Sequence, residues 1–283
     1  MISKVIDYFE LTKPRPVLLV IFSTAAGFLL ATQKSLDLAR FSSTLLGTVL
    51  VAAGAMTLNQ WMERDQDGCM PRTASRPLPA GRVRPLEAFI FGAVLAIAGF
   101  FFLWSRVNAT SALLAGLTLG VYLLIYTPLK KKTSLCTLVG AIPGALPPLI
   151  GWSAAGELTP AAWVLFVILF LWQMPHFLAI AWMYRKEYAA ARFSVLSVQD
   201  PVGDQVGRQI LLYSLALIPV SLLPTLYGMT GIFYFFAALG FGIYFVSLGL
   251  TGLKQMDKAA RLLFRTSVFH MSFLLILMII DKG

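Results

Sequence analysis

The sequence has few charged residues for its length. Only 13% of its 283 residues are Asp, Glu, Lys or Arg, whereas 58% are hydrophobic. A soluble domain carries about 25% charged residues, so this chain has too few of them to cover a water-facing surface of its size. The deficit excludes an ordinary soluble domain and indicates an integral membrane protein.

Cysteine is also scarce, and no repeat or low-complexity tract is present. The two cysteines, Cys69 and Cys136, cannot build a disulfide framework. The net charge of +10 would suggest a nucleic-acid partner in a soluble protein. Here the basic residues stand between apolar runs, which membrane topology explains. We therefore expect no nucleic-acid partner.

Nine apolar stretches are long enough to cross a bilayer, which takes about 20 mostly apolar residues. One of them contains Pro143, Pro147 and Pro148. Backbone breaks at membrane depth are tolerated only against protein or a wet cavity, so we expect this stretch inside the bundle. The predicted spans are residues 17–32, 41–62, 86–104, 110–127, 135–154, 161–184, 210–228, 232–253 and 262–280.

Basic residues gather on one side of these spans. Nineteen Lys and Arg residues fall in the N-terminal segment and in the loops after the second, fourth, sixth and eighth spans. Four fall on the other side: Lys34, Arg40, Arg106 and Lys282. The positive-inside rule then places the N-terminus in the cytoplasm. We predict an all-α integral membrane protein, with nine transmembrane helices around a central cavity that the cytoplasmic loops 63–85 and 185–209 cap.

Polar residues are concentrated near the end of the second span. Asn59, Glu63 and Asp67 are spaced by four, which places them on one face of a helix. Carboxylates at a membrane surface are costly unless a cation neutralises them, and they suit Mg²⁺ shared with substrate phosphates. Arg72 and Arg76 follow, and arginine matches phosphate oxygens. The pattern allows either a Mg²⁺–diphosphate site or a charged loop with internal ion pairs.

The same residues resemble a known motif. Asn59, Glu63 and Asp67, followed by the Arg-Thr-x-x-Arg segment at 72–76, resemble the first aspartate-rich motif of the UbiA superfamily of intramembrane prenyltransferases. Within it, the chain resembles the branch that farnesylates haem. Further matches are the segments 11–16, 126–131, 144–152, 172–177, 185–188 and 195–196, in the same order. Two positions depart from the superfamily pattern: Glu63 replaces an Asp, and Ala191 replaces the second acid that usually follows Glu187.

The resemblance implies the activity. A single prenyltransferase domain, residues 1–283, would lie in the bacterial cytoplasmic (inner) membrane. It would transfer the farnesyl group of farnesyl diphosphate to the vinyl group of haem B, giving haem O and diphosphate for terminal oxidases. Mg²⁺ would be the cofactor, and the protein would be embedded in the lipid bilayer. A haem A synthase or a terminal oxidase would receive the product.

The resemblance also implies roles for individual residues. The expected catalytic residues are Asn59, Glu63, Asp67 and Lys130. The expected diphosphate contacts are Arg72, Arg76, Tyr126, Lys130, Lys131, Arg185 and Glu187. The expected metal ligands are Asn59, Glu63, Asp67 and Glu187. Topology alone would also explain the lysines at 130–132.

His176 is the expected haem residue. It lies within an apolar span, where an ionisable group indicates function, and neutral imidazole can ligate haem iron. The alternative is a histidine that a neighbouring helix satisfies, which is our interpretation of His270.

Two other functions fit the composition. One is prenyl transfer to an aromatic quinone precursor, which the haem-branch segments disfavour. The other is transport, but transporters often carry internal repeats and charges at mid-membrane. Here the charges cluster at one face.

Overall fold

The computed structural model describes residues 2–33 and 35–283, so Met1 and Lys34, the latter one of the basic residues counted above, lie outside the described residues. Over that range nine helical segments are long and apolar enough to span a membrane, which confirms the predicted fold class. They are α2 (Pro14–Ala31), α3 (Leu38–Gly68), α4 (Pro85–Arg106), α5 (Ala109–Gly120) continued by η1 (Val121–Tyr126) and α6 (Thr127–Leu129), α7 (Cys136–Ala145) with α8 (Pro147–Ala155), α9 (Pro160–Met183), α12 (Asp204–Leu226), α13 (Ile232–Lys254) and α14 (Met256–Ile280).

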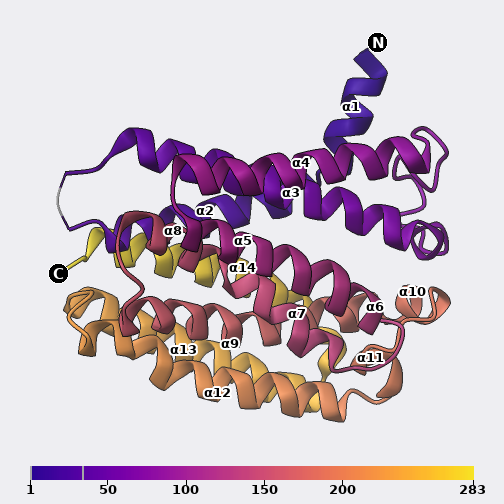
Figure 1. Cartoon of the computed structure of the whole chain (residues 1–283). Coiled ribbons are helices and arrows are strands. Elements are labelled where there is room, and N and C mark those ends of the chain that lie inside the picture. Colours follow the sequence, from indigo (N-terminus) through magenta and orange to yellow (C-terminus); the bar gives the residue numbers. More distant parts are fainter. Residues whose placement is uncertain (1, 34) are drawn as a thin grey trace.

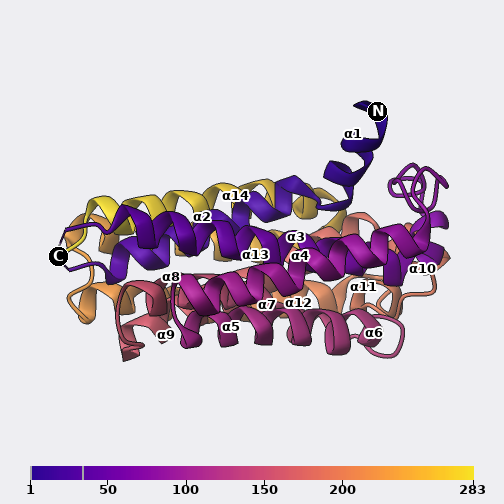
Figure 2. The same cartoon turned by 45° about the horizontal axis from the view of Figure 1, so that its top comes forward.

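The spans form a closed bundle. Helix α2 packs on α3 and α8, α9 packs on α7, α12 and α14, and α14 returns to contact α2. The two chain ends lie at opposite ends of the bundle (Figures 1 and 2). Residues 69–84, α6 and the short helices α10 (Arg185–Ala190) and α11 (Leu196–Gln199) gather at the N-terminal end, which we call the loop end.

Three helices extend well beyond the predicted spans. Helix α3 continues to Gly68 instead of residue 62, α12 begins at Asp204 instead of residue 210, and α14 begins at Met256 instead of residue 262. A span predicted from hydropathy ends at the first charged residues. The helix itself can continue past them where the charged side chains are paired. Asp67 on α3 pairs with Arg76, and Asp257 on α14 accepts a hydrogen bond from the Trp182 indole.

The proline-rich fifth span is internal, as predicted. Its helix breaks at Leu146 between α7 and α8, and nearly every side chain of α8 is buried. Helices α2 and α8 approach so closely that glycine is required on both. A Cβ atom on Gly27 would lie 2.0 Å from the carbonyl oxygen of Pro148, and one on Gly151 would lie 1.9 Å from that of Thr24. This contact fixes α8 against the first span.

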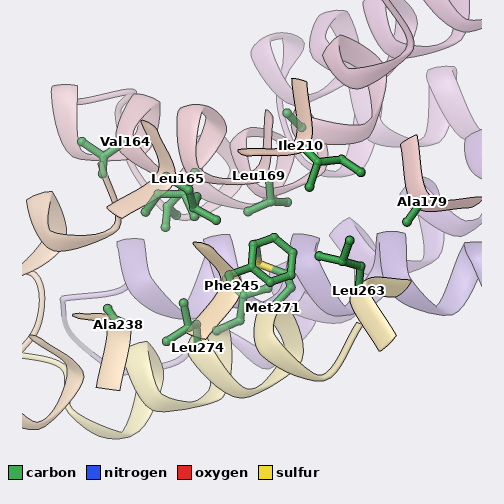
Figure 3. Packing of buried hydrophobic residues seen from close by; sticks show 14 of the residues in the cluster. Val164, Leu165, Leu169, Ala179, Ile210, Ala238, Phe245, Leu263, Met271 and Leu274 are labelled. Atoms are coloured by element: carbon green, nitrogen blue, oxygen red, sulfur yellow. The ribbon is translucent and has the colours of Figure 1, made fainter. Parts of the chain in front are cut away.

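The main hydrophobic core lies among α9, α12, α13 and α14 (Figure 3). Phe245 and Met271 fill its centre, with Leu169 of α9 on one side and Leu274 on the other. His270 is buried in the same region, where its ring stacks on Phe241 at a centroid distance of 5.4 Å. Neither ring nitrogen of His270 has a hydrogen-bond partner among the described residues, so aromatic packing alone surrounds this side chain, and no hydrogen bond from a neighbouring helix satisfies it.

The N-terminal helix α1 (Ile2–Leu11) stands away from the bundle (Figures 1 and 2). Val5, Ile6 and Phe9 are each more than half exposed, although they are apolar. Asp7 on the same helix is buried in an ion pair with Arg82. A helix with an apolar exposed face and a paired polar face suits the membrane–water interface. Helix α1 is therefore tied to residues 69–84 through Asp7 and leaves an apolar face uncovered.

The α2–α8 contact can be tested with Gly151→Ala. The added methyl group would overlap the backbone of Thr24 and Phe28, and overpacking of this kind costs about 1–3 kcal/mol. We expect a lower midpoint of thermal unfolding in detergent. Gly240→Ala on α13 is the control, since its Cβ would meet nothing within 4 Å. Equal midpoints for the two variants would contradict the assigned contact.

Candidate active site at the loop end

Three polar side chains of α3 point into the bundle near the loop end. Asn59 is 1% exposed, Glu63 5% and Asp67 2%. The predicted shared face of the helix is therefore confirmed. Asp65, on the same helical turn, is exposed, and within the described residues its carboxylate pairs only with Arg64, at 3.7 Å. The helix thus separates one exposed acid from two buried ones.

Each buried acid is paired with a cation from another part of the chain. The Nζ atom of Lys130, just after α6, lies 2.8 Å from Oε1 of Glu63. The guanidinium of Arg76 donates a hydrogen bond of 2.7 Å to Oδ2 of Asp67. Burial by itself lowers the pKa of Lys130, but the Glu63 carboxylate raises that pKa well above its usual value. Lys130 therefore remains a cation at neutral pH.

Lys13 belongs to this site, although we did not predict it. It precedes Pro14 with φ at 49°, and its Nζ donates a 2.8 Å hydrogen bond to Oδ1 of Asn59. Burial lowers the pKa of Lys13 to about 7, and the nearby cation of Arg76 acts in the same direction. An anion bound here would favour the charged form. The matched segment 11–16 was the signal in the sequence that could have placed Lys13 in the site. We had instead counted this lysine among the basic residues that set the membrane topology.

A π-helical turn shapes the wall opposite α3. Directly after η1, the hydroxyl of Thr127 donates to the carbonyl of Tyr122, five residues earlier, and accepts a 3.1 Å hydrogen bond from the amide of Asn59. The rings of Tyr122 and Tyr126 stack with a centroid distance of 5.4 Å. Turns of this type are frequent at functional sites. Tyr122 was not predicted, although its four-residue spacing from Tyr126 was a usable signal.

An apolar cavity of about 350 Å³ extends from these residues into the bundle. Lys13, Arg76, Tyr122 and Tyr126 form its polar end. Its deeper wall is apolar and includes Val20, Val51, Ala55, Leu119, Ile150 and Phe177. The cavity thus has a cationic polar end and an apolar interior, which suits a ligand with an anionic head and an apolar tail.

Arg72 and Glu187 face each other across the loop end. Nε of Arg72 lies 4.0 Å from Oε2 of Glu187, and its guanidinium lies 4.6 Å from the ring centroid of Tyr184. Oε2 of Glu187 is buried and accepts no hydrogen bond from the described residues. A buried carboxylate oxygen that accepts no hydrogen bond fits a cation ligand.

The predicted metal ligands do not close around one point. Among residues 2–33 and 35–283, no three His, Cys, Asp or Glu side chains gather into a metal-binding group. This donor set fits Mg²⁺ that one or two carboxylates share with a phosphate ligand. It does not fit a cage built from protein side chains alone.

Two predicted diphosphate residues lie elsewhere. Arg185 pairs with Asp257 of α14 at 3.1 Å, and its guanidinium lies 4.1 Å from the ring centroid of Trp182. It begins α10 on the side of α9 that faces α14, so the structure does not bring it to the cavity. Lys131 is exposed and does not line the cavity either.

His176 also faces away from the apolar cavity. Its Nδ1 lies 2.7 Å from the hydroxyl of Ser267 on α14, and its ring stacks on Trp172 at 5.1 Å. The next residue, Phe177, lines the cavity. Successive helical residues point about 100° apart, so α9 presents different residues to the cavity and to α14.

Sequence comparison identifies the family. The model of the UbiA prenyltransferase family matches residues 20–274. This chain belongs to that family. Its relatives include the Protoheme IX farnesyltransferase of Solibacter usitatus, which is 47% identical over 98% of both chains. The Protoheme IX farnesyltransferase of Opitutus terrae is 42% identical over 99% of this chain and 96% of its own.

Solved structures share the UbiA fold. Digeranylgeranylglyceryl phosphate synthase superposes with a TM-score of 0.83 at 18% identity, over 99% of this chain and 98% of its own. A UbiA homologue from Archaeoglobus fulgidus, bound to GPP and Mg²⁺, gives a TM-score of 0.66 at 14% identity, over 96% and 99%. The agreement places the nine spans in the arrangement typical of the family.

The Glu63–Lys130 pair can be tested by a double-mutant cycle. Glu63→Gln leaves the largely buried ammonium of Lys130 without a carboxylate, which costs about 3–5 kcal/mol for a buried pair. We expect Glu63→Gln/Lys130→Met to recover most of this loss. Unfolding by denaturant in detergent measures both. Asp65→Asn, at the exposed pair, should change stability by less than about 1 kcal/mol. Additive effects of the two substitutions would contradict the pairing.

Proposed function

We propose that this chain transfers the farnesyl group of farnesyl diphosphate to a vinyl group of haem B, giving haem O and diphosphate. One observation carries the proposal: the buried acids Glu63 and Asp67 on α3 are each paired with a cation, and one of these cations, Arg76, lines the polar end of an apolar cavity. The full-length relatives named Protoheme IX farnesyltransferase support haem as the acceptor. An assay that offers both haem B and an aromatic quinone precursor would separate this activity from the alternative one.

The donor would bind with its diphosphate at the polar end of the cavity and its chain inside. Lys13 and Arg76 line that end directly, and Lys130 stands behind it on Glu63. Arg72 is the fourth cation, next to Glu187. As diphosphate enters, these cations would turn from the protein's own acids to the phosphate oxygens. The apolar wall would hold the isoprenoid chain and exclude water from the reacting carbon.

The acids that these cations release would be free to hold Mg²⁺. We propose that one or two of the carboxylates of Glu63, Asp67 and Glu187, with the amide oxygen of Asn59, would hold it together with the phosphate oxygens of the donor. Bound there, Mg²⁺ supplies positive charge to the departing diphosphate oxygens. The ammonium group of Lys13 adds positive charge from the protein itself, which also stabilises the leaving diphosphate.

The reaction is an ionisation followed by addition. The bond between C1 of the farnesyl group and its oxygen breaks, and diphosphate leaves with the electron pair. The stacked faces of Tyr122 and Tyr126 line this end of the cavity, where aromatic rings stabilise a cation. The terminal vinyl carbon of haem attacks C1, and the porphyrin stabilises the positive charge on the other vinyl carbon. Water adds there and loses a proton, which leaves a hydroxyethylfarnesyl group.

We further propose the setting of this reaction. The chain would be one prenyltransferase domain, residues 1–283, in the bacterial cytoplasmic membrane, with the loop end and the N-terminus in the cytoplasm. The excess of basic residues at the loop end supports this orientation. Haem O would then pass to a haem A synthase or a terminal oxidase in the same bilayer.

Substitution of the α3 acids tests the activity. Asp67→Ala and Asn59→Ala should each lower haem O formation by about 100-fold or more, because leaving-group stabilisation is lost. Product is measured by mass spectrometry of membranes from a bacterial host that lacks its own haem O synthase. Asp65→Ala is the matched control on the same helix, since its side chain is 78% exposed.

The three variants should insert in equal amounts, which immunoblotting of membranes verifies. Near-normal haem O formation by Asp67→Ala would remove Asp67 from the site. A wild-type chain that makes no haem O from haem B and farnesyl diphosphate would overturn the proposed function itself.

The native cysteines test the orientation. Cys69 is exposed at the loop end, whereas Cys136 is buried. A membrane-impermeant maleimide should label Cys69 in inverted membrane vesicles but not in intact spheroplasts. Cys69→Ser should abolish the label, and Cys136→Ser should retain it. Labelling in intact spheroplasts would place the loop end outside the cytoplasm.

A further inference from the structure

A second cavity opens at the loop end, between the last turn of α9 and the first half of α14. Its volume is about 780 Å³, more than twice that of the apolar cavity, and the two share no lining residue. We call it the α9–α14 groove. The side chains on which its chemistry depends are Arg185, Asp257, Lys258, Arg261, Phe264 and Arg265.

The groove carries an excess of positive charge. Asp257 is its only carboxylate, and it pairs with Arg185. Lys258, Arg261 and Arg265 take part in no ion pair within the described part of the chain. Their spacing of three and four residues places them on one face of α14. Like charges at this spacing repel each other, so an anion in the groove would relieve the repulsion.

Behind the basic rim lies an aromatic stack that includes His176. Phe264, which lines the groove, lies 5.2 Å from the His176 ring, which in turn stacks on Trp172. Nδ1 of His176 is held by the hydroxyl of Ser267. The groove therefore combines several cations at the loop end with aromatic side chains in its wall, Trp182, Tyr184 and Phe264, and the buried His176 lies behind Phe264.

The apolar cavity leaves little room for a second substrate. At about 350 Å³ it lies near the lower end of the range for ligand pockets, about 300–1,000 Å³. The isoprenoid chain would fill it. A large acceptor therefore needs a surface of its own, and the α9–α14 groove is the larger of the two.

We propose that the α9–α14 groove binds haem B through its two propionates, with Arg261 and Arg265 as the main carboxylate contacts and Lys258 beside them. The proposal rests on the proposed function, since it assigns the acceptor of that reaction. Haem is a flat apolar ring with two carboxylates on one edge, which matches the aromatic wall and basic rim. The vinyl groups occupy the opposite edge, so anchoring the propionates at the surface directs a vinyl group into the bundle.

The test compares Arg261→Gln/Arg265→Gln with a control, Lys186→Gln/Arg208→Gln. The control residues are exposed basic residues near the same end that do not line the groove. Both proteins are studied in nanodiscs of neutral phosphatidylcholine. We expect the groove variant to raise the KM for haem B by about tenfold, because two charge-assisted contacts are lost. The kcat and the KM for farnesyl diphosphate should stay unchanged, as should all three parameters of the control.

Haem B dimethyl ester, whose carboxylates are blocked, provides a second arm. The wild-type protein should bind it about tenfold more weakly than haem B, whereas the groove variant should bind both alike, because the same contacts are absent. Equilibrium titration followed by Soret absorbance gives these values without turnover. The groove can thus be judged even if no haem O forms, an outcome that would count against the proposed function alone.

Two results would overturn the proposal. One is a haem B affinity of the groove variant equal to that of the wild type. The other is a loss of co-purifying phosphatidylglycerol from the groove variant with no change in haem affinity, which would make the groove a lipid headgroup site.

Discussion

The structure depends on neutralising the acids that α3 buries. An uncompensated carboxylate in such a place costs several kcal/mol, and Glu63 and Asp67 are both nearly inaccessible. Their partners come from different elements, Lys130 after α6 and Arg76 in residues 69–84. The ion pairs therefore hold α3, residues 69–84 and the segment after α6 together at the loop end. The positions of these two segments are set by the carboxylates with which Arg76 and Lys130 pair.

The same pairing limits how ligands can enter. Lys130 and Arg76 are already paired with Glu63 and Asp67, so diphosphate alone would leave these two acids without partners. A divalent cation alone would compete with Lys130 and Arg76 for the same carboxylates. With both present, Lys130 and Arg76 would pair with phosphate oxygens, the acids would be free to hold the metal ion, and every charge would keep a partner. We infer that the site favours the metal–diphosphate complex over either component.

The sequence predicted features that depend on local pattern. The spans follow from apolar length, and the shared face of Asn59, Glu63 and Asp67 follows from helical spacing. Features set by tertiary contact were missed or misplaced. Lys13 was assigned to topology because its partner, Asn59, stands 46 residues away. Arg185 was grouped with the diphosphate site because of the family resemblance, yet its ion-pair partner, Asp257, lies on α14.

Helix α9 explains why neighbours in sequence serve different places. It packs against α7 on one side and α14 on the other, and Gln173 approaches Gly144 so closely that a Cβ there would lie 1.9 Å from Oε1. A helix held this tightly presents Phe177 to the apolar cavity and His176 to α14. The motif at residues 172–177 therefore contains residues that face the apolar cavity and residues that face α14. The role of each residue could be assigned only once the structure showed which side it faces.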